Sequence, residues 1–383
     1  MSVSKEPFRF AYQVAFEHNH DVSDALKQRI FVEQVARIEK ALKSKQKPTR
    51  KVLVMGAAGY IGGMVSQTLH HLGYEVTAAD LLLYENEAIG LFSQQPPQSR
   101  FHRVDLRSMD ELKEIVTPDM DVIWLAALVG DPISKKYPEQ SIKINEQSVF
   151  EFLDTYHDKI GRFVFASTCS NYGLQDHSEP LKETDSLNPQ SIYARNKVAV
   201  EKYLLEHHKN WDCDPTILRF ATAFGVAPRM RFDLTVNQFA HEMFHNKDLV
   251  VYDPDTWRPY CHVRDFAEVI RRVLEFPQEL VSGEVFNVGS DQNNYTKRSI
   301  VTLLQEYLPD APVRYQLHGS DPRNYRVDFS KIREVLQFTP GYSVKDGVEE
   351  LLMLIRQGLF RDVEKRPNFY GNRSIPLFAS VEQ

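Results

Sequence analysis

Short apolar runs that end at glycine or acidic residues alternate along this chain with stretches of helical periodicity. Val52–Met55 ends at Gly56, and Met64–Leu72 after it has the pattern of a helix that begins near Tyr60. Short apolar runs bounded by turn residues predict buried strands. The other expected strands are Glu75–Ala79, Ser99–Val104, Asp121–Leu125, Arg162–Ala166, Asp214–Phe220 and Gly283–Gly289. Strands that alternate with helices predict an α/β fold with a doubly wound parallel sheet.

A glycine-rich turn follows the first strand, with Gly56, Gly59 and Gly62 at intervals of three. In such a turn the first glycine permits the tight bend, the second lets the backbone approach a pyrophosphate, and the third lets the helix pack on its strand. The amino terminus of that helix, with Tyr60 and Ile61, then faces the phosphates. The spacing and its strand–turn–helix context predict a dinucleotide site.

Asp80 ends the second expected strand. An acid about twenty residues beyond the glycines hydrogen-bonds the ribose hydroxyls and repels the additional phosphate of NADP. The alternative is an ordinary turn acid after a strand. In this context the sequence favours NAD as the cofactor.

Tyr193 and Lys197 lie four residues apart and would share one face of a helix. The lysine ammonium would favour the phenolate, although the same spacing also occurs on ordinary solvated helices. A phenol titrates near about 10, so a base at neutral pH needs its pKa lowered by about 3, or roughly 4 kcal/mol. One lysine rarely supplies that, and a nicotinamide cation and the Thr168 hydroxyl would help. Thr168, Tyr193 and Lys197 form the expected catalytic set.

With these pieces together, the chain resembles the extended short-chain dehydrogenase/reductases, in their nucleotide-sugar epimerase and dehydratase branch. The likeness runs from about Lys51 to about Phe360. The motifs, in family order, are Gly56-x-x-Gly59-x-x-Gly62, Asp80, Asp105-Leu106, Leu125-Ala126-Ala127, Asn145, Ser167-Thr168, Tyr193-x-x-x-Lys197, Leu218-Arg219-Phe220 and Arg258-Pro259-Tyr260-Cys261-His262-Val263-Arg264-Asp265. The resemblance implies a Rossmann sheet with a smaller mixed α/β substrate lobe.

The resemblance also implies further cofactor contacts. Asp105 and Leu106 would lie near the adenine, and Leu125, Ala126 and Ala127 would follow the fourth strand into the site. Asn145 would belong to the helix that supports the lysine. Tyr193 and Lys197 would themselves touch the cofactor.

Four residues are implied on the substrate side. Arg258 matches an arginine turned toward the substrate diphosphate, a task that suits the fixed fork of guanidinium donors. Arg323 and Tyr325 fall where relatives close over a nucleotide diphosphate, although Arg323 is equally compatible with a surface position. Thr168 would hydrogen-bond the reacting oxygen of the sugar.

The expected reaction removes a proton from a sugar hydroxyl through Tyr193 while the carbon gives hydride to NAD. The resulting keto-sugar has four fates: re-reduction as a 4-epimer, loss of water, proton exchange beside the ketone, or release. Dehydratases of this family carry Asp-Glu after the threonine, whereas this chain has Cys169 and Ser170. The leading hypothesis is therefore an NAD-dependent nucleotide-sugar epimerase, with a dehydrogenase/reductase or dehydratase as the alternative.

Three further residues lie outside the expected catalytic set, and two of them have alternative interpretations. Cys169 is either an acid or base for proton exchange or a small filler at a strand end. Asp131 is either an additional base or a cap of its turn with Pro132. His262 is left out of the catalytic set because its segment is structural in relatives. A non-catalytic dinucleotide-binding regulator is a remote alternative, against which the intact Thr168, Tyr193 and Lys197 set argues.

Four regions are expected: an amino-terminal helical extension and linker (1–48), an NAD-binding domain (49–225), a substrate lobe with returning sheet elements (226–360), and a surface tail (361–383). The extension is outside the family pattern. Its apolar stripe between Val22 and Ser44 predicts a helix that packs on its own domain or a second subunit, or else binds a partner.

Composition narrows the functional classes. The net charge of −6 over 383 residues, with both signs interspersed, argues against nucleic acid as a partner. The three cysteines lack metal-ligand spacing, so neither a metal site nor a disulfide framework is expected. No apolar run has the length of a membrane span and no signal peptide is visible, which predicts a cytoplasmic protein. The family likeness implies a homodimer.

Overall fold

The computed structural model describes residues 50–84, 100–174, 179–319, 321 and 323–375. Seven parallel strands form its main sheet, in the order β10-β6-β5-β4-β1-β2-β3. The strands are β1 (Lys51–Met55), β2 (Glu75–Asp80), β3 (Arg100–Arg103), β4 (Met120–Trp124), β5 (Ile160–Thr168), β6 (Asp214–Phe220) and β10 (Glu284–Val288). The order reverses between β1 and β4, which is where doubly wound sheets bind their ligands.

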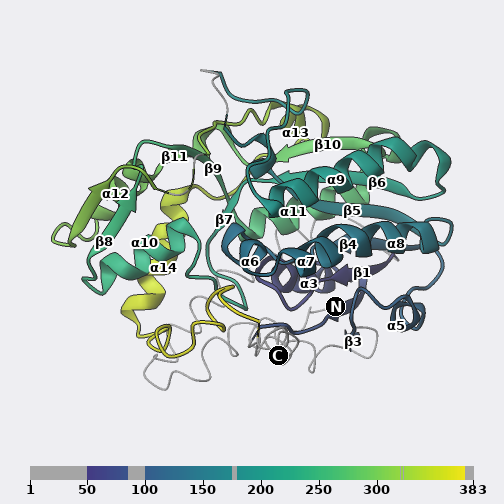
Figure 1. Ribbon diagram of the computed structural model, residues 1–383, viewed down its shortest axis with the longest axis horizontal. Coiled ribbons are helices and arrows are strands. Elements are labelled where there is room, and N and C mark those ends of the chain that lie inside the picture. The colour runs from purple at the N-terminus through teal and green to yellow at the C-terminus, as the bar shows by residue number, and fades with distance from the viewer. Residues whose placement is uncertain (1–49, 85–99, 175–178, 320, 322, 376–383) are drawn as a thin grey trace, which may run out of the picture.

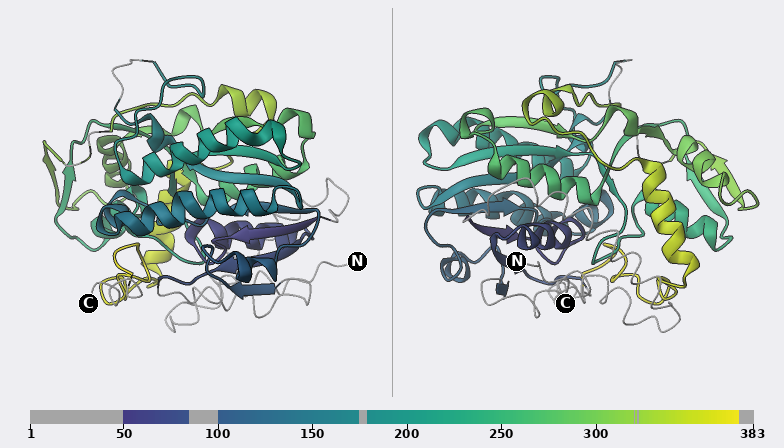
Figure 2. Two further views of the ribbon diagram at one scale, coloured as in Figure 1. Left: turned by 45° about the vertical axis from the view of Figure 1, so that its right-hand side comes forward. Right: turned by 180° about the vertical axis from the view of Figure 1, so that it is seen from behind.

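Helices cover both faces of this sheet because the strands are apolar on both. In β1, Val52 and Val54 pack into the cluster that contains α3 (Tyr60–His71) and α11 (Val263–Glu275). Leu53 and Met55 pack on the opposite side, against α8 (Ser148–Tyr156) and α9 (Ile192–His207). The two helical layers are seen from opposite sides in Figure 2. Continuous apolar strands are what a sheet buried on both faces requires.

A smaller lobe lies beside the carboxyl ends of the strands, to the left in Figure 1. It contains a three-stranded sheet, β11 (Asn294–Thr296), β9 (Trp257–His262) and β7 (Thr222–Phe224), and a parallel pair, β8 (Leu249–Tyr252) with β12 (Val313–Gln316). Helices α10 (Thr235–Phe244), α12 (Lys297–Gln305) and α14 (Val344–Arg356) enclose its own apolar core. The fold is thus a Rossmann sheet with a mixed α/β lobe, as expected.

Short elements complete the connections. They are α5 (Met109–Lys113), α6 (Asp131–Lys136), α7 (Pro138–Ile142), the π-helix η1 (Lys143–Gln147), α13 (Ser330–Val335) and the 3-10 turns η2 (Cys169–Tyr172), η3 (His208–Asn210), η4 (Gln278–Leu280) and η5 (Asp291–Asn293).

All seven expected strands are present, with ends that differ by a few residues at most from the predicted ones. The expected amino-terminal helix lies outside the described residues. The expected surface tail beyond Arg361 is wrong for its described part. Phe369 and Tyr370 are each only 9% exposed and Ile375 is fully buried, because this segment packs against both halves of the molecule.

Candidate active site

A cavity of about 690 Å³ lies at the carboxyl ends of the sheet strands, against the smaller lobe. Every predicted site residue except Asn145 lines it. The tertiary structure therefore brings residues from Gly56 to Tyr325 to one place, in the position where an open parallel sheet binds its ligand.

The glycine turn leaves no room for side chains. Gly56 has a φ of +85°, and a Cβ there would lie 2.7 Å from the backbone nitrogen of Ala126. A Cβ on Gly62 would lie 1.9 Å from the Gly56 carbonyl oxygen. Helix α3 therefore begins tightly against β1, with its free amino-terminal N–H groups beside the cavity, where they suit a pyrophosphate.

The Asp80 carboxylate is fixed at the end of β2. It accepts hydrogen bonds from the backbone nitrogens of Ala58, at 3.1 Å, and Leu82, at 2.8 Å. Burial raises the pKa of Asp80, and these two hydrogen bonds oppose that rise. The acid expected to bind ribose thus also braces the glycine turn.

The remaining predicted cofactor residues divide into two groups. Asp105, Leu106 and the residues after β4 line the cavity, and Asp105 accepts hydrogen bonds from the guanidinium of Arg107. Asn145 does not line the cavity. It is buried, accepts from the Leu128 nitrogen at 2.7 Å and donates to the Leu128 carbonyl at 3.2 Å. Its contact with the site is therefore indirect, through the loop after β4.

The catalytic set comes from two adjacent elements. Thr168 ends β5, and its hydroxyl accepts from the Ser170 nitrogen at 3.1 Å. Ser191 caps α9, which places Tyr193 in the first turn and Lys197 in the second. The Lys197 ammonium lies 5.9 Å from the centre of the Tyr193 ring. The three side chains line the same cavity.

The protein alone does not lower the pKa of Tyr193, which corrects the expectation that Lys197 would do so. Burial raises the pKa of Tyr193 well above its usual value, Asp131 adds to the rise, and the nearby arginines Arg231 and Arg323 oppose it. Burial also lowers the pKa of Lys197 to about 7, opposed by the charge of Glu201. Desolvation therefore favours the neutral form of both groups.

A buried ion pair, which the sequence analysis missed, lies one helical turn beyond Lys197. Glu201, one helical turn further along α9, pairs with Arg219 of β6 at 2.7 Å. Glu201 also accepts hydrogen bonds from the Ser167 hydroxyl of β5 and, at 2.8 Å, from Asn171. Both charges are nearly inaccessible, so the pair fixes the position of α9 against two strands.

The two arginines predicted to bind substrate both donate hydrogen bonds to the same carboxylate. Arg258 and Arg323 both donate to Asp321, at 3.0 and 2.7 Å, and these arginines hold the pKa of the half-buried Asp321 well below its usual range. Arg323 also reaches Ser170, at 3.0 Å, and Asp131, at 2.9 Å. Arg323 is thus a cavity residue rather than a surface residue. Asp131 is engaged in an ion pair, which argues against a second base.

Four other basic side chains of the cavity were missed in the sequence, one of which is Arg373, beyond α14. Arg229 and Arg231 come from the loop between β7 and α10, and Lys297 begins α12. Arg231 pairs with Asp233 at 2.8 Å. The alternation of arginines in Arg229-Met230-Arg231 was a visible signal, but their location depends on how the smaller lobe folds back.

Of the two interpretations of Cys169, the structure favours a small buried side chain at the end of a strand over an acid or base. Its thiol is 1% exposed, donates to the Arg219 carbonyl at 3.2 Å and does not line the cavity. Burial raises the pKa of this thiol well above its usual value, which disfavours the thiolate that acid–base chemistry needs.

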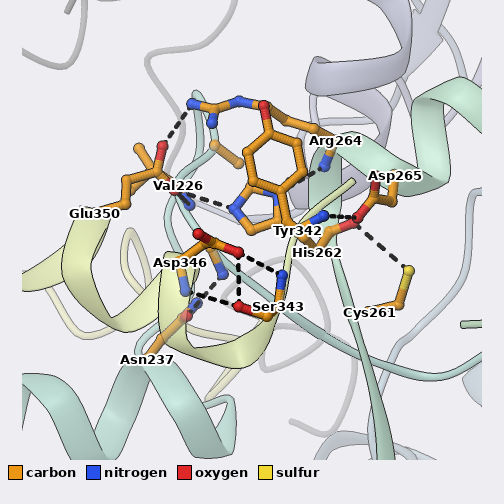
Figure 3. A network of polar contacts seen from close by, with 12 residues as sticks. Val226, Asn237, Cys261, His262, Arg264, Asp265, Tyr342, Ser343, Asp346 and Glu350 are labelled. Carbon is orange, nitrogen blue, oxygen red and sulfur yellow. Dashed lines mark hydrogen bonds and ion pairs between the residues drawn. The ribbon is translucent and has the colours of Figure 1, made fainter. Parts of the chain in front are cut away.

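His262 is structural, and Figure 3 shows its surroundings. Its ring lies 3.0 Å from the Glu350 carboxylate, stacks on Tyr342 and accepts from the Arg264 nitrogen at the start of α11. The ring is fully buried and outside the cavity.

The described residues contain no cluster of acidic, cysteine or histidine side chains placed to hold a metal. They also contain no helix long and apolar enough to cross a membrane.

Comparison with known proteins identifies the family. Residues 52–289 match the model of the NAD dependent epimerase/dehydratase family. The chain belongs to that family. The matched residues include the glycine turn, Asp80 and the Thr168, Tyr193 and Lys197 set, and the cofactor of the family is NAD.

Three relatives of this epimerase/dehydratase family member show how far the likeness extends. An uncharacterized UDP-glucose epimerase, YtcB, of Bacillus subtilis is 27% identical over 78% of this chain and 95% of its own length. UDP-glucuronic acid decarboxylase 1 of Arabidopsis thaliana is 25% identical, over 82% of this chain and 72% of its own. The structure of UDP-glucuronic acid 4-epimerase from Bacillus cereus with UDP-glucuronic acid and NAD is 26% identical, with a TM-score of 0.69, covering 80% of this chain and 99% of that one.

Proposed function

We propose that this family member is an NAD-dependent nucleotide-sugar epimerase that works through a transient keto-sugar. The observation that carries the proposal is the shared cavity of the glycine turn, the Thr168, Tyr193 and Lys197 set, and a group of arginines. The turn suits a dinucleotide, the set suits proton removal from a hydroxyl, and the arginines suit a second diphosphate.

The residues have separate tasks in this reaction. Tyr193 accepts the hydroxyl proton of the sugar, and Thr168 hydrogen-bonds the same oxygen. Lys197 in its charged form stabilises the phenolate. Bound NAD supplies the hydride acceptor and a positively charged ring, which adds to the stabilisation that the protein alone does not provide. Arg258 and Arg323 bind the substrate diphosphate, which replaces the Asp321 carboxylate as their hydrogen-bond acceptor.

Elimination of water has less support. The position after Thr168 is a buried cysteine, and Ser170 after it carries no acid. Asp131, a carboxylate that lines the cavity near Tyr193, is paired with Arg323. The runner-up is another reaction through the same keto-sugar, such as the decarboxylation named for the Arabidopsis relative or net dehydrogenation.

Two finer points are part of the proposal. We infer a homodimer formed through α9 and the helices around η1. We also infer a cytoplasmic location, because all three cysteines are free, buried thiols, which suits a reducing compartment.

The deciding experiment incubates the protein with a panel of nucleotide sugars, uronic acids included, and follows product mass together with absorbance of reduced nicotinamide. An isomeric product of unchanged mass without net NADH is expected. Loss of the mass of water or carbon dioxide, or stoichiometric NADH, would replace the epimerase assignment by a dehydratase, decarboxylase or dehydrogenase. Bound NAD without any turnover would favour a non-catalytic regulator.

A further inference from the structure

Residues 361–375, here called the C-terminal strap, cross from the smaller lobe to the cofactor half of the molecule, at the lower edge of Figure 1. On the side of the smaller lobe, the Tyr370 carbonyl accepts from the Phe232 nitrogen at 2.8 Å. At its end, Ile375 is buried against Leu128, Ile133 and Tyr137. The strap therefore joins the two halves next to the cavity.

Asn372 is the strap residue whose side chain connects the walls of the cavity. It accepts from the Arg229 guanidinium at 3.0 Å and donates to the Val129 carbonyl at 3.2 Å. Its backbone nitrogen donates to Asp233 at 3.1 Å. Asn372 lines the cavity and is 9% exposed. The Asn372 amide thus fixes a loop of the smaller lobe and the loop after β4 relative to each other.

Arg229 is a buried cation that forms no ion pair with another residue of the described part of the chain. It is 3% exposed, and its other guanidinium contacts are the carbonyls of Asn368 and Gly371 at 3.2 and 3.1 Å. Among the arginines that line the cavity, Arg231, Arg258 and Arg323 pair with carboxylates, whereas Arg229 has no ion pair among the described residues. Its Nε is buried and has no hydrogen-bond partner there. A buried charge of this kind is costly unless a ligand of opposite charge completes the site.

The position of Arg229 indicates which ligand that is. Its guanidinium lies over the Tyr84 ring, 4.7 Å from the ring centre, and Tyr84 follows shortly after the ribose-binding candidate Asp80. Burial lowers the pKa of Arg229 to about 10. The negative charge of Asp80 is among the interactions that oppose this decrease, so the two side chains lie close enough to interact. Pro228 packs 3.5 Å from the site of a Cβ on Gly63, within α3. Arg229 therefore lies at the cofactor end of the cavity.

We propose that Arg229, held by Asn372 of the C-terminal strap, binds the pyrophosphate of the dinucleotide, so that cofactor affinity depends on a segment outside the Rossmann sheet. Arg229 would supply a charged donor opposite the amino terminus of α3. Asn372 is a positioning residue in this arrangement. The inference rests on the NAD site and not on the fate of the sugar, so its failure would leave the proposed epimerase reaction untouched.

The test is direct titration of NAD into protein freed of cofactor, for Arg229→Gln, Asn372→Ala and the control Asn368→Ala. Asn368 is on the same strap, but its side-chain hydrogen bonds go to Ser374 alone among the described residues. Loss of a charged donor should weaken NAD binding by at least roughly tenfold in Arg229→Gln and by roughly threefold to tenfold in Asn372→Ala, with the control unchanged. UDP, the probe for the substrate diphosphate site, should bind all three variants like wild type.

Circular dichroism and thermal unfolding separate a binding effect from misfolding, and Asn372→Ala tests the proposal should the buried arginine prove necessary for folding. Unchanged NAD affinity in Asn372→Ala and Arg229→Gln would overturn the proposal. So would an equal loss in Asn368→Ala, which would indicate a structural role of the whole strap. A loss of UDP binding with NAD binding intact would assign Arg229 to the substrate instead.

Discussion

Lys197 and Tyr193 have their pKa values moved in opposite directions by one cause, burial. In the cofactor-free protein both side chains are therefore driven toward neutrality, whereas the proposed reaction needs an ammonium and a phenolate. The missing stabilisation of these charges must come from the bound ligands. We therefore expect the ionisation of Tyr193 and Lys197 to be coupled to cofactor binding.

The pKa of Lys197 makes the stability of the cofactor-free protein pH-dependent. An unfolded lysine keeps its proton until about pH 10.4, whereas the folded one loses it near 7, so between these values the unfolded state binds more protons. This group should raise the free energy of unfolding by about 2 kcal/mol between about pH 7 and 9. Urea unfolding at both pH values measures it. The rise should be absent from Lys197→Met, and a wild type that behaves like the variant would contradict the shift.

Tyr193→Phe tests the base. Removing the hydroxyl should lower kcat by roughly 10² to 10⁴ while NAD affinity stays within about twofold, because the ring and Lys197 remain. Steady-state turnover of the substrate found in the panel, with NAD titration beside it, gives both values. Turnover close to wild type would assign proton removal to another group.

Asp80 tests the choice of cofactor. Its carboxylate also accepts the Ala58 and Leu82 N–H groups, so Asp80→Ala would remove a brace together with a charge. Asp80→Asn keeps an acceptor and removes the charge. Both variants should bind NAD roughly tenfold more weakly and discriminate less against NADP, with the larger loss for Ala. Unaltered preference in titrations of the two dinucleotides would show that Asp80 does not set it.

At the level of elements, the β1–α3 turn leaves little room for side chains on its glycines. Gly62 and Gly63 are neighbours in α3, yet a Cβ on Gly62 would meet the Gly56 carbonyl at 1.9 Å, whereas one on Gly63 would meet Pro228 at an ordinary 3.5 Å. Gly62→Ala should therefore displace the turn and abolish measurable NAD binding. Gly63→Ala should bind NAD normally and gain about 0.5–1 kcal/mol from helix propensity. Equal behaviour of the two in titration and thermal unfolding would contradict this account.

At the level of the whole molecule, contacts between the two halves enclose the cavity. Tyr60 of α3 donates to the Gly225 carbonyl and accepts from Asn237 of α10 at 3.2 Å. The C-terminal strap adds the second connection. Tyr60 begins α3 at the glycine turn, and the strap contacts the loop after β4. Because both places line the cavity, the smaller lobe and the cofactor half are expected to move together when ligands bind.

The proposed homodimer is the prediction at this scale. Leu205 of α9 is 39% exposed, although it is apolar and lies on a helix expected at the interface. Leu205→Lys should convert a dimer into a monomer in light scattering, whereas Leu317→Lys, at a 65% exposed position in the smaller lobe, should not. A wild-type mass of one chain would exclude the dimer.

The sequence alone predicted the parts of this protein that depend on local order: the strands from their short apolar runs, the glycine turn from its spacing, and Tyr193 with Lys197 from the period of a helix. These follow because backbone geometry ties neighbouring residues to one another. The parts that depend on distant segments were decided by the tertiary structure alone. It removed Cys169 from the site, paired Asp131 with Arg323, placed Arg229 at the cofactor end and turned an expected surface tail into a strap. Burial and charge pairing decide such matters, and both arise only when residues far apart in the chain come into contact.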